Sequence, residues 1–400
     1  MTSNDEIHAY LGSLETVYHR ELSSYPDGKV LTLPLVYLPD IVLFPGDDLP
    51  LRMLSDSVSF RSFRDLLSSG EALLAVLPPH QTGPQLGVTV RVERFSVEDD
   101  GVRMAGGARQ RFRLRQRLRE ESDAELFLWG EVEILAEDRA QSIPFDDLCW
   151  RSRVEGQSNE KNKTRNLRRI RGRQFPAYWG YATYALYDAR VLVQKIQSML
   201  LSNIHGEWFH KPRTERSSGQ NDDDERDEKA SLVHYLAVPS DIQDPNLFAF
   251  WVARNLPLDT TQRLDLLRMN STVRLLRREI ELLEQTQEDI FCFLCGSFLA
   301  NTRDIFSMTA CGAAGGTYVN PGGHVFQVLT LRDVDRANVV VDMNRSTEDT
   351  WFAGYVWSIT HCNSCYQHLG WRFDRVDFTR LPATFFGFRR AALTRSRSPR

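Results

Sequence analysis

Four of the six cysteines form two Cys-x-x-Cys pairs, Cys292 with Cys295 and Cys362 with Cys365. A structural zinc ion takes four thiolate ligands at about 2.3 Å in a tetrahedron, and each pair places two sulfurs on one tight turn. The stretch between the pairs is much longer than the roughly 15 to 20 residues of a zinc ribbon, so we expect a small domain between them. The sequence therefore predicts one structural zinc ion. A redox-active pair is the alternative, but it does not explain why there are two pairs.

Large aromatic side chains gather around the second cysteine pair: Trp351, Trp357, Trp371 and Phe373. Packing in a core is the default role of any one tryptophan. However, Trp371 and Phe373 lie two apart, which on a strand places them on one side. Gly354 suits a turn, so Trp351 and Trp357 can face each other across a hairpin. Indole walls around a small space form a cage, and both a methyl-ammonium group and a neutral cyclic imide suit such walls.

Length and composition limit the classes of function. A chain of 400 residues with 42% hydrophobic content is long enough for two or three domains, each with its own core. The formal net charge of -4 argues against binding of nucleic acid through a large basic face. We see no signal-like segment and no apolar run of about 18 residues, so we expect no membrane and a location in the cytoplasm and nucleus. In a reducing compartment the paired cysteines favour metal over disulfides.

Short strands are expected in the first third of the chain. Residues 30–53 alternate aliphatic runs with Pro and Gly, as strands separated by turns do. Further strands are expected at 73–77, 88–92, 103–114 and 126–135, which together predict a mostly antiparallel β-domain. Arginines recur at every second position from 109 to 117, and acidic residues follow them, so we interpret this stripe as a solvated face of the sheet.

The middle of the chain combines charged loops with helices. Residues 151–173 and 214–229 are strongly polar and predict exposed or mobile loops, whereas residues 178–200 have helical apolar spacing. Asp259 and Gln262 can form a capping box at the start of a further helix. The apolar stripe of that helix is expected to face a core or, alternatively, a partner helix; it consists of Leu266, Met269, Val273, Leu276, Ile280 and Leu283.

Three segments resemble the N-terminal substrate-binding domain of Lon proteases: LPLVYLPDIVLFPGDDLPL, GGARQRFRL and LPLDTTQRLDLLRMNSTVRLLRREIELL. The sequence has no G-x-x-x-x-G-K-[ST] phosphate loop, and it is too short for the ATPase and protease domains of Lon. A Lon-type recognition domain without these parts implies an adaptor.

The segment CNSCYQHLGWRF resembles the second zinc knuckle of type B methionine sulfoxide reductases. Such a reductase needs a reactive thiolate further along the chain to attack the sulfoxide sulfur. No cysteine follows Cys365, which argues against this enzyme. The reductase and a ligase-independent sensor of small molecules or methyl-ammonium groups are the alternative functions.

A longer resemblance covers residues 30–393. The segments FCFLC, ACGAAGGTYVNPGGHVFQVLTL, STEDTWFAGYVWSITHCNSCYQHLGWRF and FFGFRRAAL follow one another as in the C-terminal thalidomide-binding (CULT) domain of the cereblon family. The resemblance implies a non-catalytic substrate receptor of a cullin-4 RING ubiquitin ligase. It implies docking to the β-propeller DNA-damage-binding adaptor through a helical segment, with residues 178–200 as the candidate. It also implies a cage that binds glutarimide small molecules and substrate proteins with cyclic-imide degrons.

The resemblance also assigns residues. It implies a cage of Trp351, Trp357, Trp371 and Phe373, with Asn320 at the rim, and zinc ligands at Cys292, Cys295, Cys362 and Cys365. Asp349 stands where the family usually has histidine, so the resemblance implies backbone contacts from this position rather than side-chain ones. The rim residues His324 and Phe326 also depart from the vertebrate pattern.

The expected fold class is α+β and multidomain: a Lon N-terminal-like antiparallel β-domain, a helical segment and a C-terminal all-β domain of the β-tent kind, braced by zinc. The expected division is a flexible segment 1–28, the Lon-like β-domain 29–148, a helical adaptor-binding segment with charged mobile loops 149–286, the CULT domain 287–390 and a basic tail 391–400. Residues 150–230 match the family poorly.

Overall fold

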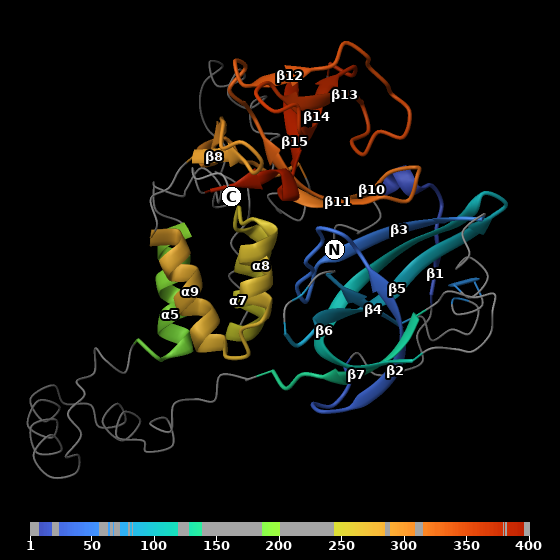
Figure 1. The fold of residues 1–400 in the computed structure, drawn as a ribbon, viewed down its shortest axis with the longest axis vertical. Helices are drawn as coiled ribbons and strands as arrows, with labels where there is room; N and C mark the ends of the chain where they lie inside the picture. Colours follow the sequence, from blue (N-terminus) through green and yellow to red (C-terminus); the bar gives the residue numbers. More distant parts are fainter. Residues whose placement is uncertain are drawn as a thin grey trace, which may run out of the picture.

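The structure is a computed structural model that describes residues 8–17, 24–55, 63–64, 67, 73–78, 81, 83–118, 128–137, 186–200, 244–284, 289–308, 315–378, 380 and 382–395. Figure 1 shows three regions: a β-domain (blue to cyan), a group of helices beside it, and a C-terminal sheet domain (orange to red) that lies across both. This arrangement confirms the α+β, multidomain fold class. The loops 151–173 and 214–229, residues 178–185 of the expected helix, Cys149 and Cys311 lie outside the described residues.

The β-domain is built on a sheet that closes on itself. Its strand order is β1-β5-β4-β2-β7-β6-β3, and an additional pairing of β5 with β6 closes the ring. The pairings are antiparallel except for that of β2 with β4. The expected strand at 73–77 is confirmed as β4, those at 88–92 and 103–114 lie within the longer strands β5 and β6, and β7 occupies part of the expected 126–135. The strands are β1 (Glu15–Thr16), β2 (Val30–Tyr37), β3 (Asp48–Leu54), β4 (Leu73–Leu77), β5 (Leu86–Glu98), β6 (Gly101–Leu118) and β7 (Leu128–Ile134).

The helices pack beside the β-domain and share one apolar core with it. The capping box is confirmed: the backbone N–H of Gln262 donates to the Asp259 carboxylate over 2.8 Å, and the Gln262 side chain accepts from the backbone N–H of Asp259. The expected helix at 178–200 is confirmed for its second part. The helices are α5 (Ala189–Leu200), α7 (Pro245–Asn255), α8 (Thr260–Leu267) and α9 (Thr272–Glu284).

One expectation is wrong and another holds only in part at one place in the structure. The arginine stripe is exposed as expected at Arg109, Arg113, Arg115 and Arg117, but not at Arg111. The continuous apolar stripe after Asp259 predicts one helix, but the chain forms α8 and α9 with a break between them. The Arg111 side chain fills this break and donates to the carbonyls of Leu267 and Met269. Arg111 therefore does not lie on a solvated face; it is 2% exposed and forms a 2.7 Å ion pair with Glu137. Carbonyls at a helix end need donors, and a buried guanidinium supplies them.

The C-terminal domain consists of two antiparallel sheets. The larger has the order β10-β11-β15-β14-β13-β12, and the smaller the order β16-β8-β9. The short helix η4 (Arg390–Ala392) joins β15 to β16. The strands are β8 (Asp289–Cys292), β9 (Phe298–Asn301), β10 (Gly315–Val319), β11 (Val325–Leu331), β12 (Val339–Val341), β13 (Tyr355–Cys362), β14 (His368–Arg375), β15 (Thr384–Arg389) and β16 (Leu393–Thr394).

Buried polar contacts join the C-terminal domain to the rest of the chain. The amide of Gln327 on β11 exchanges two hydrogen bonds with the backbone of Val42, as a neighbouring strand would. Arg390, which is buried, donates to the carbonyl of Leu256 just after α7, where carbonyls lack helical partners.

Within the segment 1–28, residues 8–17 form η1 (Ala9–Leu11) and β1, which pairs with β5. The hydroxyl of Tyr10 accepts a hydrogen bond from the backbone N–H of Val319.

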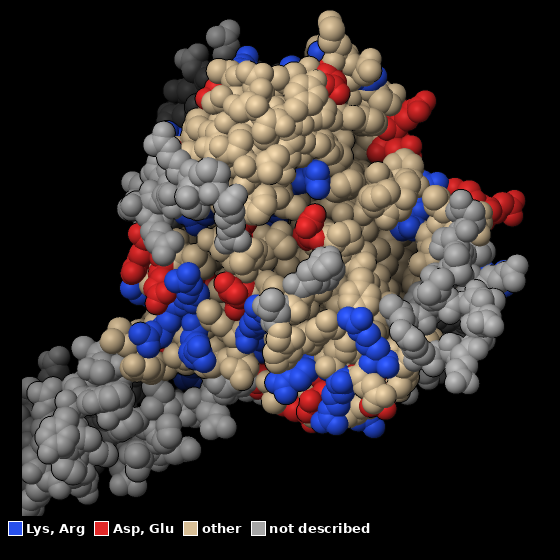
Figure 2. Space-filling model, viewed as in Figure 1, with Lys and Arg blue, Asp and Glu red and all other residues tan. Residues whose placement is uncertain are grey.

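The visible surface is mixed in charge. In the view of Figure 2, basic side chains gather over the helices and the lower part of the β-domain, interspersed with acidic ones, while the surface over the C-terminal sheets is mostly uncharged. On this face the charge pattern therefore shows no continuous basic surface of the kind that binds nucleic acid. Of the helices in the described residues, none has the length and apolarity needed to cross a membrane.

Candidate functional site

The two cysteine pairs form two equivalent turns. Cys292 ends β8 and Cys362 ends β13. In each turn, the backbone N–H of the first cysteine donates to the carbonyl of the residue five positions later. The N–H of the residue four positions later donates to the carbonyl of that cysteine. All of these bonds are 2.8–2.9 Å long. The residue four positions on has a left-handed backbone: φ is +71° at Gly296 and +62° at Tyr366. The Cys-x-x-Cys spacing thus produces the same local geometry twice.

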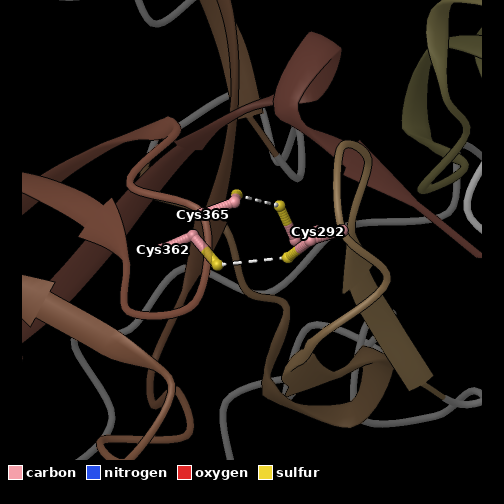
Figure 3. A group of neighbouring side chains, drawn as sticks. Cys292, Cys362 and Cys365 are labelled. Carbon is pink, nitrogen blue, oxygen red and sulfur yellow. Dashed lines mark hydrogen bonds between the residues drawn. The ribbon is translucent and has the colours of Figure 1, made fainter.

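The four sulfurs converge from these two facing turns (Figure 3). The Sγ atoms of Cys292 and Cys365 lie 3.6 Å apart and those of Cys295 and Cys362 lie 3.5 Å apart, and all four lie within 4.8 Å of one another. Metal–sulfur bonds of about 2.3 Å in a tetrahedron require sulfur separations of about 3.8 Å. The donor set therefore fits one tetrahedral metal ion, which confirms that these cysteines are positioned for a metal.

Local hydrogen bonds distinguish the thiols from one another. Burial alone would raise the pKa of the Cys295 thiol, but hydrogen bonds with Ser297 and with two neighbouring thiols outweigh it and lower the pKa to about 6. Burial raises the pKa of Cys292, whose Sγ also lies 3.1 Å from the Gln367 side-chain oxygen. A metal ion favours the thiolate form of each, so binding releases protons.

The aromatic residues lie on the two strands that adjoin the second turn. Trp357 on β13 is directly opposite Phe373 on β14, and Trp371 is two residues from Phe373. Their side chains therefore share one face of the sheet, as the spacing predicts for Trp371 and Phe373. The Phe373 side chain is 1% exposed and forms the base, whereas the three tryptophans are half-buried.

Trp351 joins this group from a different direction than the sequence suggests. It lies in the loop before β13, which begins at Tyr355 after a turn at Gly354 with φ +86°. Its ring meets Trp371 edge to face at 4.6 Å, and among the described residues no ring contact with Trp357 occurs. The expected hairpin with Trp351 opposite Trp357 is wrong. The backbone of Trp357 pairs with Ser346 instead, through two hydrogen bonds, and Trp351 lies in the loop between them.

Two aromatic residues of the β10–β11 hairpin complete the group. Tyr318 stacks on Trp351 at 5.0 Å, and Phe326 contacts Trp371 at 5.1 Å and Trp351 at 6.1 Å. The tight turn of the PGG segment pairs Tyr318 with Phe326 on one face of the hairpin, and this turn is the sequence signal that would have identified both. The carbonyl of Val319 accepts a 3.1 Å hydrogen bond from the Trp351 indole N–H.

The remaining predicted site residues lie at the edge of this aromatic group. The Asn320 side-chain oxygen accepts the N–H of His324 and thereby holds the β10–β11 turn. Asp349 has a left-handed backbone with φ +51°, and its side chain is exposed, as is that of Glu348. The carbonyl of Glu348 accepts a 2.8 Å hydrogen bond from the Trp357 indole N–H.

A neutral histidine lies beside the aromatic group. His368 meets Trp371 edge to face at 4.9 Å. Burial and the adjacent Arg389 guanidinium lower the pKa of His368 to about 4, so the imidazole is uncharged at neutral pH. The face behind Trp371 therefore carries no histidine charge that would oppose or attract a ligand.

Comparison with known proteins agrees with this architecture. The sequence profile of the family described as ATP-dependent protease La (LON) substrate-binding domain matches residues 32–285. The Lon N-terminal domain protein from Xanthomonas campestris has 18% sequence identity and a TM-score of 0.35, over 63% of this chain and 98% of that one. A Lon substrate-binding domain is thus followed by a separate sheet domain that carries the cysteine centre.

Relatives that span both parts are named protein cereblon. That of Danio rerio is 28% identical over 98% of this chain and 87% of its own length, and that of Xenopus tropicalis is 29% identical over 98% and 84%. The Drosophila melanogaster protein is 33% identical over 36% of this chain. The chain belongs to the family described as ATP-dependent protease La (LON) substrate-binding domain, over residues 32–285, and it is similar over nearly its whole length to proteins named cereblon.

Proposed function

We propose that this chain is a non-catalytic substrate receptor of a cullin-4 RING ubiquitin ligase that binds neutral cyclic imides. The proposed binding site, called the cage from here on, is formed by Trp351, Trp357, Trp371 and Phe373, with Asn320 and Asp349 at its rim. Its ligands are glutarimide small molecules and substrate proteins that end in a cyclic imide. Similarity to proteins named cereblon over nearly the whole chain supports the receptor role, and the geometry of the cage supports the class of ligand.

The observation that carries the choice of ligand is a free backbone edge beside the aromatic rings. Within the described residues, the N–H of Trp351 and the carbonyl of Asp349 make no hydrogen bond to the chain. A cyclic imide presents a carbonyl, an N–H and a second carbonyl in a row, which matches such a donor and acceptor. Once a ligand covers this edge, a backbone group that it leaves unpaired costs about 1 to 3 kcal/mol, so the edge selects for an imide with a free N–H.

A cation is the competing ligand for aromatic walls, and the charges argue against it. Cages for methyl-ammonium groups commonly add a carboxylate to the rings. Here the nearby carboxylates, those of Glu348 and Asp349, belong to exposed side chains. The indole N–H groups of Trp351 and Trp357 both donate to backbone carbonyls, which fixes the ring orientations without any carboxylate.

We propose zinc as the metal and a structural role for it. Four cysteines with no histidine or water position among them make a closed tetrahedral site, which is typical of structural zinc. The metal would fix the end of β13, the same strand that carries Trp357 five residues earlier. Its loss would therefore release one wall of the cage.

The ligase partner in this proposal is the β-propeller adaptor, with docking through residues 178–200. The described part of this stretch supports an interface because large apolar side chains remain exposed at its start: Leu186 is 53% and Tyr187 43% exposed. Deletion of residues 176–232 should abolish co-purification of the adaptor from cells. Because α5 packs into the shared core, imide binding of the same variant is measured to check that the C-terminal domain is still folded. Retained adaptor binding would refute this placement.

The decisive experiment is a titration of the full chain with glutarimide while tryptophan fluorescence is followed. Glutarimide should bind saturably, and N-methylglutarimide should not bind because the imide donor is gone. A trimethyl-lysine peptide serves as the cationic competitor. Tight binding of that peptide, or equal binding of the methylated imide, would refute the imide proposal. Turnover of a methionine sulfoxide substrate would refute the non-catalytic role.

A further inference from the structure

A cavity of about 300 Å³ lies between the β-domain and the C-terminal domain, and one of its lining residues, Phe326, also contacts the cage residues Trp351 and Trp371. One wall is the loop that follows β2 in the β-domain, and the other is the β10–β11 hairpin with the end of β15. The lining residues on the first wall are Tyr37, Leu38, Pro39, Asp40 and Ile41, and on the second Gly323, His324, Val325, Phe326, Gln327, Arg389 and Ala391. Two of them, His324 and Phe326, are also expected at the rim of the cage; the others belong neither to the predicted cage nor to the cysteine centre.

Arg389 gives this cavity, whose lining is mixed polar and apolar, a cationic group. Its guanidinium stacks over Phe326 at 5.5 Å, and Nη1 makes two long contacts to His368, of 3.3 and 3.4 Å. Its Nε is buried and has no hydrogen-bond partner among the described residues. The buried Nε cannot touch a ligand in the cavity, but the two Nη atoms at the end of the guanidinium match the two oxygens of a carboxylate, so a bound carboxylate would accept hydrogen bonds from them.

We infer that this cavity is a second ligand site, distinct from the cage, that takes a small organic monocarboxylate with an apolar body. Arg389 receives the carboxylate, and the apolar body lies against Tyr37, Ile41 and Val325. The volume is at the lower limit of the roughly 300 to 1,000 Å³ of small-molecule sites, which favours a compact ligand. The single cation and the nearby carboxylate of Asp40 disfavour a second negative charge.

Occupation of the cavity would influence both the domain junction and the cage. Its two walls come from the two domains, so a ligand that contacts both stabilises their association and raises the midpoint of thermal unfolding. Phe326 lines the cavity and also packs against Trp351 and Trp371, so a ligand in the cavity would fix a ring that contacts the cage.

The test is a titration of the full chain with 4-fluorobenzoate, followed by fluorine NMR, with the neutral isostere 4-fluorobenzamide as the control ligand. Benzoate should bind and raise the unfolding midpoint, and benzamide should bind at least about tenfold more weakly, because charge-assisted hydrogen bonds contribute more than neutral ones. Excess glutarimide should not displace benzoate, which separates this site from the cage.

Two variants should act in opposite directions, which a general folding defect cannot do. Arg389→Gln should weaken benzoate binding at least about tenfold, since the paired charge is lost. Asp40→Asn should strengthen it several-fold, and asparagine tolerates the left-handed backbone of this position, where φ is +61°. Arg336→Gln, an arginine whose side chain is 86% exposed, is the matched control and should change nothing. Equal affinity for the two ligands, displacement by glutarimide, or an unchanged affinity in Arg389→Gln would overturn the inference.

Discussion

The cysteine centre and the aromatic cage share strand β13 but are built in different ways. Each half of the cysteine centre is a short turn with its own complete set of hydrogen bonds, and the two halves need only be brought together. The cage has no such local unit: Trp351 comes from a loop, Trp357 from β13, and Trp371 from β14. The comparison predicts that loss of one cysteine ligand abolishes metal binding and unfolds the C-terminal domain. Loss of one aromatic wall should instead lower the affinity of the cage for its ligand while the domain stays folded.

The largest effect is expected when one metal ligand is removed. Cys362→Ser should leave the C-terminal domain unfolded or aggregated, because metal binding supplies folding free energy, about 10 to 16 kcal/mol in zinc-finger peptides. Metal content by mass spectrometry and near-ultraviolet circular dichroism should both fall. Ser364→Ala, in the same turn, is the control and should behave as the wild type does. A metal-free preparation whose C-terminal domain still melts cooperatively would contradict this prediction.

The second effect concerns the cage and should separate affinity from stability. Trp357→Ala removes one half-buried wall, so glutarimide affinity should fall by about 2 kcal/mol or more, which is roughly thirtyfold. The unfolding midpoint should change little in comparison with Cys362→Ser. Phe378→Ala removes an aromatic ring that is 84% exposed in the same domain and should leave affinity unchanged. Unfolding of the C-terminal domain in Trp357→Ala would contradict the difference between the cysteine centre and the cage.

Acid should weaken the N-terminal segment that contacts the aromatic group. Burial, and secondarily Arg94, lower the pKa of His8 from 6.5 to about 4, and its ring meets that of Tyr318, which stacks on Trp351. Since the neutral ring favours the folded state, this stability is complete above about pH 6.5 and is lost as the pH falls towards 4. The loss should be about 2 kcal/mol at pH 5.

Urea unfolding of the wild type and of His8→Phe measures this loss. The variant should lose less stability than the wild type between pH 7 and pH 5, and the two should show the same pH dependence between pH 7 and pH 8. Asp48, whose pKa burial and Asp47 raise to about 6, titrates in both proteins, so the difference between them isolates His8. Parallel pH curves throughout would contradict the assignment.

The smallest effect is expected at the rim of the cage. Asp349→Asn keeps the backbone carbonyl and a residue type that tolerates φ near +51°, so glutarimide affinity should change by less than about twofold. Isothermal titration calorimetry of wild type and variant checks this directly. A loss of tenfold or more would assign a direct ligand contact to the Asp349 carboxylate and would favour the cationic ligand.

The sequence by itself determined the features that depend on neighbouring residues. The capping box of Asp259 and Gln262, the strand at 73–77 and the second part of the helix at 178–200 follow from local propensities and periodicity, which tertiary contacts did not override. The Cys-x-x-Cys spacing similarly determined that each cysteine pair would form a turn able to present two sulfurs, and the period of two placed Trp371 beside Phe373.

Tertiary structure decided everything that needs residues far apart in the chain. Arg111 ended α8 from a strand that precedes it by more than a hundred residues, so periodicity alone predicted one long helix. Trp351 met Trp371 and Tyr318 because the β10–β11 hairpin folds over the loop before β13, and no local pattern encodes that approach. The cavity lined by Phe326 exists because Asp40 and Arg389 come from different domains that pack together. Local patterns set how each segment folds, but the free energy of packing sets which segments meet.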